Sequence, residues 1–180
     1  AQSRLFEERF IASNIPYKIV GGVNFYSRKE VKDMLSYLKT IANGQDDLAV
    51  RRIINVPKRG IGATSITKVA IYAAEHEMNF YSALCEAAEI PGLGKAAAKI
   101  EPFVLFVQSM KAKSQLKPVS ELLQEIIETT GYVRELEAEG TDEAEARIEN
   151  IDELISKAVD YEEAQEHPTL DGFLEEVALV

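Results

Sequence analysis

The sequences VPKRGIGAT at residues 56–64 and IPGLGKA at residues 90–96 share one pattern. In each, a predicted helix ends near a proline, a Gly-aliphatic-Gly turn follows, and a new helix begins at once. Glycine lets the backbone adopt left-handed conformations and approach a ligand closely, and the N–H groups that start the new helix attract anions. The aliphatic residue between the glycines can fill the junction of the two helices. The pattern therefore predicts two helix-hairpin-helix-like turns that bind DNA phosphates without reading the bases.

Positive side chains flank both turns, where a DNA backbone would lie. They are Lys58, Arg59 and Lys68 around the first turn and Lys95 and Lys99 around the second. A single Gly-x-Gly after a helix is often only a helix C-cap and a tight turn, so each copy alone is weak evidence. The second copy is the weaker one because acids lie near it in the sequence, at Glu86, Glu89 and Glu101. Two copies with flanking cations together favour contact with duplex DNA.

Most of the chain after residue 26 has the apolar spacing of helices. Ser27 and Glu30 have the spacing of a capping box that opens a helix ending at Asn43-Gly44. Its apolar stripe is Val31, Met34, Leu35, Leu38 and Ile41. Asp46 or Asp47 can cap the next helix, which carries Leu48, Val50, Ile53 and Ile54 and ends before Pro57. Further helices are predicted at about residues 64–77, 80–89, 95–113, 119–130, 132–138, 142–163 and 170–179.

One segment, residues 17–20, has the composition of a β-strand, and it follows a predicted helix at about 3–13. A single buried strand needs a sheet to satisfy its backbone groups, and no partner strand is evident. We therefore expect residues 1–26 to be the edge of an α/β domain that lies mostly outside this chain, and residues 27–180 to be a helical domain. The apolar end at Leu179-Val180 also favours a fragment of a longer protein.

The charge of the chain is unevenly distributed. The 180 residues include 20 Lys and Arg against 30 Asp and Glu, a net charge of −10, which by itself argues against a nucleic-acid partner. However, residues 1–120 carry 17 basic and 11 acidic residues, whereas residues 121–180 carry 3 and 19. The window 51–68 holds five positive charges and no acid. The two parts are therefore expected to have different electrostatic roles.

The acidic part leaves two alternatives open. Its carboxylates occur at helical spacing among Arg134, Arg147 and Lys157, which is typical of a solvated helix face. The helices at about 121–166 could instead form a protein-interaction or autoinhibitory module that docks on a basic partner or on other domains of a longer parent protein. A helical filler domain without a ligand is the third interpretation.

Several classes of function are disfavoured. A single cysteine, Cys85, and two histidines, His76 and His167, leave little for a metal centre, so no metal site is expected. Gly94-Lys95 lacks the preceding glycine and the following Ser or Thr of a phosphate-binding P-loop. Cys85 follows Leu84 on an apolar face and is expected to be buried and inert. His76 is expected to be a capping or surface residue at a helix end and not a catalytic base. No apolar run is long enough to span a membrane, so a cytoplasmic location is expected. No active site is predicted.

Several segments occur in the order found in one helicase family. They are Ala1-Gln2-Ser3-Arg4, Pro16-Tyr17 to Gly21-Gly22, Phe25 to Lys32-Asp33, Gly60-Ile61-Gly62 and Arg147-Ile148-Glu149-Asn150. In these segments the chain closely resembles the UvrD/PcrA/Rep-type superfamily 1 DNA helicases, above all the PcrA-like enzymes of Gram-positive bacteria. The similarity extends over essentially the whole chain.

This resemblance implies a fold and a role. Residues 1–26 would be a remnant of the second RecA-like motor domain, 2A, and residues 27–180 the helical 2B subdomain. The family uses ATP and Mg²⁺ to move 3′ to 5′ along single-stranded DNA, and 2B holds duplex DNA at a fork or junction and regulates the motor domains. This chain lacks the ATPase motifs, so it should bind no cofactor and be inactive alone. A bacterial, nucleoid-associated location follows from the same resemblance. The residues that would contact duplex DNA are Lys58, Arg59, Gly60, Ile61, Gly62, Thr64, Lys68, Gly92, Leu93, Gly94 and Lys95, and Arg4 would contact the single strand.

Overall fold

The computed structural model describes residues 24–180, and these residues form helices and no β-strand. The expectation of a mostly α-helical domain is confirmed for this part of the chain. The predicted strand at residues 17–20, the predicted helix at 3–13 and Arg4 lie outside the described residues. The elements are α3 (Lys29–Ala42), α4 (Asp47–Ile53), α5 (Ala63–Glu75), α6 (Phe80–Cys85), the short 3₁₀ helix η1 (Ala87–Glu89), α7 (Ala96–Ser114), α8 (Val119–Thr130), α9 (Tyr132–Glu139), α10 (Asp142–Ala164) and α11 (Leu170–Ala178).

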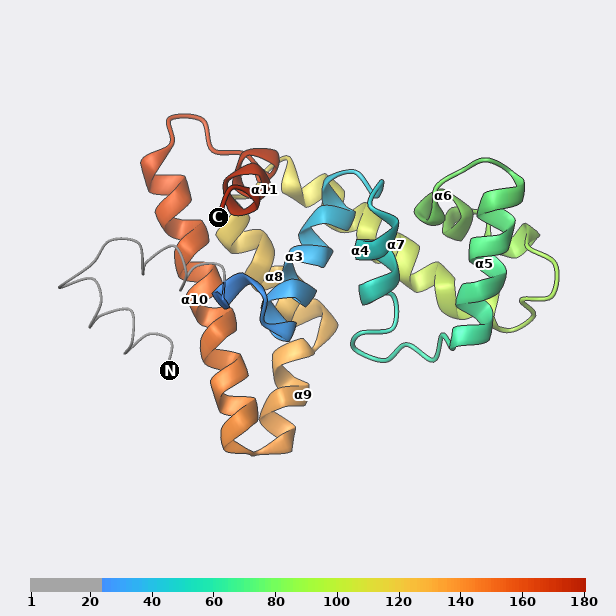
Figure 1. Ribbon diagram of the computed structural model, residues 1–180, viewed down its shortest axis with the longest axis horizontal. Coiled ribbons are helices and arrows are strands. Elements are labelled where there is room, and N and C mark those ends of the chain that lie inside the picture. Colours follow the sequence, from blue (N-terminus) through green and yellow to red (C-terminus); the bar gives the residue numbers. More distant parts are fainter. Residues whose placement is uncertain (1–23) are drawn as a thin grey trace.

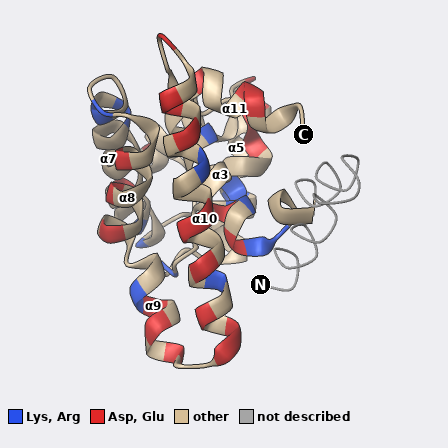
Figure 2. Cartoon of the chain, turned by 90° about the vertical axis from the view of Figure 1, so that its left-hand side faces the viewer, with Lys and Arg blue, Asp and Glu red and all other residues tan. Residues whose placement is uncertain are grey.

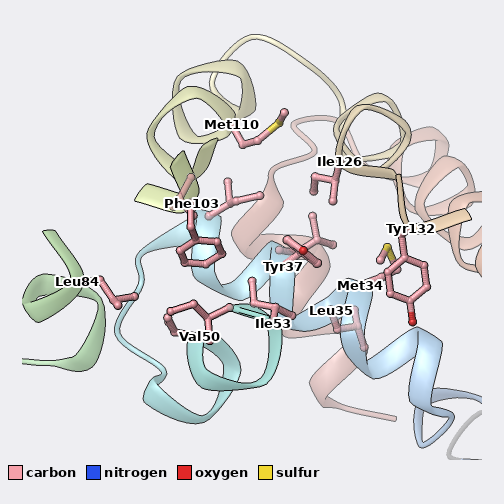
Figure 3. Packing of buried hydrophobic residues seen from close by; sticks show 14 of the residues in the cluster. Met34, Leu35, Tyr37, Val50, Ile53, Leu84, Phe103, Met110, Ile126 and Tyr132 are labelled. Atoms are coloured by element: carbon pink, nitrogen blue, oxygen red, sulfur yellow. The ribbon is translucent and has the colours of Figure 1, made fainter. Parts of the chain in front are cut away.

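Helix α3 is the centre of the fold and contacts α4, α7, α8, α10 and α11 (Figure 1). Its predicted apolar stripe is buried throughout, and Tyr37 is buried beside it. Figure 3 shows Met34, Leu35 and Tyr37 of α3 with Val50 and Ile53 of α4 and Phe103 and Met110 of α7. Because α3 is enclosed by helices from both halves of the chain, one continuous apolar core joins the basic and acidic parts.

Helix α4 matches its predicted face only in part. Val50, Ile53 and Ile54 have no exposed surface, whereas Leu48 in the first turn is 81% exposed. The predicted cap is present, because the side chain of Asp46 accepts a hydrogen bond from Ala49 N at 3.1 Å. The stretch predicted as one helix at 80–89 is broken at Glu86 into α6 and η1.

The capping box predicted at Ser27 and Glu30 is wrong. The N-cap of α3 is Arg28, and it makes no side-chain capping bond. Ser27 Oγ donates instead to Asn24 O at 2.7 Å, and the Glu30 carboxylate accepts from Asn150 Nδ2 of α10 at 2.6 Å. Asn150 Oδ1 also accepts from Arg28 Nη1 at 2.8 Å. A partner on a distant helix has replaced the local one, and it ties the start of α3 to α10.

A buried carboxylate fastens α3 to two other helices. Asp33 is 1% exposed and accepts hydrogen bonds from Lys29 Nζ and Arg52 Nε, both at 2.8 Å. It also accepts one from the Tyr132 hydroxyl at 2.6 Å. Burying a charge is costly unless it is paired and hydrogen-bonded, and these three donors meet that requirement. The pKa of Tyr132 is raised by burial and by its bond to Asp33, so this hydroxyl remains a donor.

Helix α10 supplies a further long-range cap. The Glu162 carboxylate accepts from Ser120 N at 2.6 Å and from Ser120 Oγ at 2.9 Å, at the N-terminus of α8. A negative charge is favourable there because the helix dipole is positive at that end. Residues 24–180 contain no helix with both the length and the hydropathy needed to cross a bilayer.

Candidate nucleic-acid interface

The first turn is organised by one side chain that the sequence analysis did not single out. Asn55 Oδ1 accepts hydrogen bonds from the backbone N–H groups of Arg59, at 2.7 Å, and Ile61, at 3.2 Å. It thereby satisfies two backbone N–H groups of the loop and holds residues 56–61 in a fixed conformation. Asparagine commonly bonds to nearby backbone in turns, so an Asn at the end of a predicted helix and before Val-Pro was a usable signal.

The four glycines of the two turns are not equivalent. Gly60, Gly92 and Gly94 have φ values of +77°, +81° and +58°, the left-handed region that favours glycine. Gly62 has φ −83° and ψ 172°, an ordinary extended conformation, and serves as the N-cap of α5. The expectation that glycines provide left-handed backbone is confirmed at three of these positions. Gly62 has no side chain, so nothing at the N-cap covers the first backbone N–H groups of α5.

The aliphatic residues between the glycines fill the helix junctions, as the pattern predicts. Ile61 is 1% exposed and Leu93 is 6% exposed, and both belong to the central core. Their side chains therefore anchor the turns, and only their backbone atoms are available to a ligand.

Two lysines bring the turns together. Lys68, on α5 after the first turn, donates through Nζ to Gly92 O of the second turn at 2.7 Å. Lys99, on α7 after the second turn, lies over the first turn, because a Cβ built on Gly60 would be 3.3 Å from Lys99 Nζ. Each turn is thus contacted by the helix that follows the other, and the two motifs form one continuous surface.

Arg59 is turned inward. Its Nη1 donates to the backbone carbonyls of Ile53, at 2.7 Å, and Ile54, at 3.0 Å, at the end of α4. Its Nη2 donates to the Tyr37 hydroxyl at 2.7 Å, and the guanidinium lies 4.9 Å from the centre of the Phe103 ring. Burial raises the pKa of Tyr37, which stays protonated and donates to Val56 O. This geometry gives Arg59 the role of holding the first turn on the core.

The remaining cations face solvent. Lys58, Lys95 and Lys99 are exposed, and none of the ion pairs among residues 24–180 includes them. Thr64 is also exposed, in the first turn of α5, where no side chain caps the helix. Uncapped N–H groups at a helix start favour an anion. The first turn therefore combines two features of a phosphate site.

The second turn is less open to an anion. The N–H groups of Ala96 and Ala97 at the start of α7 are bonded to Leu93 O and Gly94 O, at 3.1 and 3.3 Å. Of the acids noted near this turn, Glu86 accepts a hydrogen bond from the Tyr72 hydroxyl through Oε1 at 2.9 Å. This hydrogen bond is the main reason that the pKa of Tyr72 is raised.

The residues considered for other chemistry are separate from this surface. His76 is the C-cap of α5, its Nδ1 is 2.9 Å from Tyr72 O, and its ring stacks on Tyr72, so its capping role is confirmed. Cys85 is exposed, which contradicts its expected burial, because it ends α6 facing away from the core. Partial cover still raises the pKa of its thiol. In the described part of the chain, no group of three or more His, Cys, Asp or Glu side chains is placed so that it could hold a metal ion.

Comparison with known proteins places the chain in a family. The model described as the UvrD-like helicase C-terminal domain matches residues 1–180. The chain belongs to this family.

Among curated proteins, this UvrD-like helicase C-terminal domain is similar to the ATP-dependent DNA helicases PcrA of Staphylococcus aureus and Staphylococcus epidermidis. The identities are 44% and 42%, and each alignment covers 100% of this chain and 25% of the relative. The chain therefore spans about a quarter of the length of these relatives. The resemblance expected from the sequence is confirmed.

Proposed function

We propose that this UvrD-like helicase C-terminal domain is the duplex-binding and regulatory 2B subdomain of an ATP-dependent 3′–5′ DNA helicase. It would hold the DNA backbone at a fork or junction without sequence specificity. ATP and Mg²⁺ would be bound by the motor domains of the whole protein, with residues 1–26 as part of the second of them. The chain by itself would neither hydrolyse ATP nor unwind DNA, and the whole protein would act on the bacterial nucleoid.

One observation carries this proposal: the two Gly-x-Gly turns lie side by side and are joined by contacts between them. Lys68 and Lys99 join the turns reciprocally, so that exposed Lys58, Lys95 and Lys99 belong to one surface together with the uncapped start of α5. Cations and backbone N–H groups bind phosphates and do not distinguish bases. The expected contacts are the side chains of Lys58, Thr64, Lys95 and Lys99 and the backbone of Gly60 to Gly62 and of Gly92 to Gly94. Arg59 and Lys68 would act by positioning the turns.

A salt titration of duplex affinity tests the proposal. The variant Lys58→Ala/Lys95→Ala/Lys99→Ala is compared with Lys32→Ala/Lys39→Ala/Lys111→Ala, which removes three exposed lysines elsewhere and has the same net charge. Each lost phosphate contact lowers the slope of log affinity against log salt by about 0.9, so the first variant should lose roughly 3 and the control almost nothing.

The same titration on two blunt duplexes of unrelated sequence checks the mode of binding. Both duplexes should have the same affinity for the wild-type chain within about twofold, because backbone contacts carry no sequence code. Equal slopes for the two triple variants would refute the proposed contact surface. A strong preference for one duplex would refute backbone recognition.

A further inference from the structure

A hollow of about 470 Å³ opens beside the first turn. The turn contributes Pro57 and Lys58, α7 contributes Lys99 and Phe106, and the last turn of α8 contributes Thr129. This volume lies in the range of small-ligand sites. The hollow adjoins the proposed duplex surface because Lys58 and Lys99 belong to both.

The charge of the hollow favours an anion. Lys58 and Lys99 come from different elements, are exposed, and make no ion pair within residues 24–180. No carboxylate lines the hollow. By contrast, the hollow at the α9–α10 turn is lined by Glu137, Glu145 and Glu149. Two ammonium groups that line one hollow without a carboxylate beside them favour an anion such as a phosphate.

The rest of the lining is suited to a ring. Phe106 is half-buried and packs edge-to-face on Tyr37, with ring centres 5.8 Å apart, which fixes its orientation. Pro57 and Pro102 add apolar surface, and Thr129 provides an exposed hydroxyl. An aromatic side chain beside cations is the combination with which proteins bind unpaired nucleotides, through stacking and phosphate contacts.

We propose that this hollow binds a single unpaired nucleotide, with its phosphate at Lys58 and Lys99 and its base against Phe106. The inference rests on the proposed function for its main source of ligand, an unpaired nucleotide next to the duplex held by the turns. A free mononucleotide has the same chemistry and is the other source. The hollow would thus make the chain prefer forked over blunt DNA.

The test changes Thr129, which lines the hollow and belongs to neither turn. Thr129→Glu places a negative charge beside the phosphate, and Thr129→Lys places a positive one. Gln124→Glu adds the same negative charge to an exposed position of α8 that does not line the hollow. The probes are a forked duplex with thymidine tails, the blunt duplex of the same sequence, and thymidine monophosphate.

Thr129→Glu should weaken binding of the forked duplex about fivefold, and Thr129→Lys should strengthen it. Because Lys58 and Lys99 belong to both surfaces, the affinity for the blunt duplex should change in the same direction but by less than about twofold. Gln124→Glu should change none of the affinities by more than about twofold. If the Thr129 substitutions change the affinity for thymidine monophosphate but not the affinity for the forked duplex, the hollow binds a free nucleotide. Equal effects on forked and blunt DNA, or no effect of either Thr129 variant on any probe, would overturn the inference.

These outcomes separate the two proposals. If the Thr129 variants have no effect while the triple lysine variant still lowers the salt slope, the duplex surface stands and the hollow fails. If blunt-duplex binding does not depend on the lysines, the proposed function fails, and thymidine monophosphate alone decides the inference.

Discussion

The surface of the two turns and helix α10 use charged residues in opposite ways. On the turn surface, Lys58, Lys95 and Lys99 are exposed without ion pairs among the described residues, while the backbone is fixed by Asn55 and Arg59. On α10, acids outnumber basic residues, and Figure 2 marks them in red along the helix. Several polar side chains of α10 serve the fold, such as Asn150 bonded to Glu30 and Glu162 capping α8. The comparison teaches that a cluster of charged residues indicates a ligand surface only where their side chains make no hydrogen bonds or ion pairs that hold the fold together.

The largest expected effect is that of replacing Arg59. This substitution tests whether Arg59 supports the fold while its neighbouring lysines bind the ligand. Arg59→Ala removes hydrogen bonds to Ile53 O, Ile54 O and the Tyr37 hydroxyl and the contact with Phe103. The free energy of unfolding should fall by about 3 kcal/mol, because partly buried acceptors lose a charged donor. Urea denaturation measures the change.

Lys58→Ala is the matched control for Arg59, because the neighbouring cation is exposed and should change the stability by less than about 0.5 kcal/mol. The opposite ranking would assign the structural role to Lys58. An Arg59→Ala protein with unchanged stability and reduced duplex affinity would return Arg59 to the ligand surface.

An intermediate effect is expected at Gly60, which tests how the turn shape positions Lys99. Gly60→Ala places a Cβ at φ +77° and 3.3 Å from the Lys99 side chain, so the stability should fall by about 1 to 2 kcal/mol and Lys99 should be displaced. Thermal or urea unfolding and duplex affinity measure the two consequences.

Gly62→Ala provides the comparison within the same turn. Gly62 has an ordinary φ of −83°, and a Cβ there meets nothing within 4 Å, so the loss of stability should be smaller, about 0.5 kcal/mol, because alanine is a poorer N-cap than glycine. Equal losses at Gly60 and Gly62 would show that the backbone conformation of the first turn is not the one described.

The smallest effect is expected on α10. Asp152→Asn/Asp160→Asn/Glu163→Gln removes three exposed acids from this helix, which lies on the other side of α3 from α5 and α6 (Figure 1). At physiological salt the screening length is about 8 Å, so blunt-duplex affinity should rise by less than about twofold. Anisotropy titrations measure it. A gain as large as the loss caused by the triple lysine variant would abolish the contrast between the two regions.

Much of the local structure was predictable from the sequence. Helix α10 runs from residue 142 to 164 against a predicted 142–163, and α5 from 63 to 75 against 64–77. The stripe of α3 was identified because its spacing repeats every three to four residues. Three of the errors have one origin. Ser27 and Glu30 match a capping box, Cys85 lies next to apolar residues and Leu48 is itself apolar, but the packing of other helices decides what these side chains meet.

The sequence by itself determined most of the helices, the two Gly-x-Gly turns with their buried Ile61 and Leu93, and the division of charge along the chain. These depend on interactions between residues a few positions apart. Only the tertiary structure decided that Lys68 reaches Gly92, 24 positions away, and that Asn150 bridges Arg28 and Glu30 across 122 and 120 positions. It also decided that Arg59 points inward while Lys58 beside it points outward. A side chain bonds to the acceptors that packing brings within its reach, and local spacing does not encode which acceptors those are.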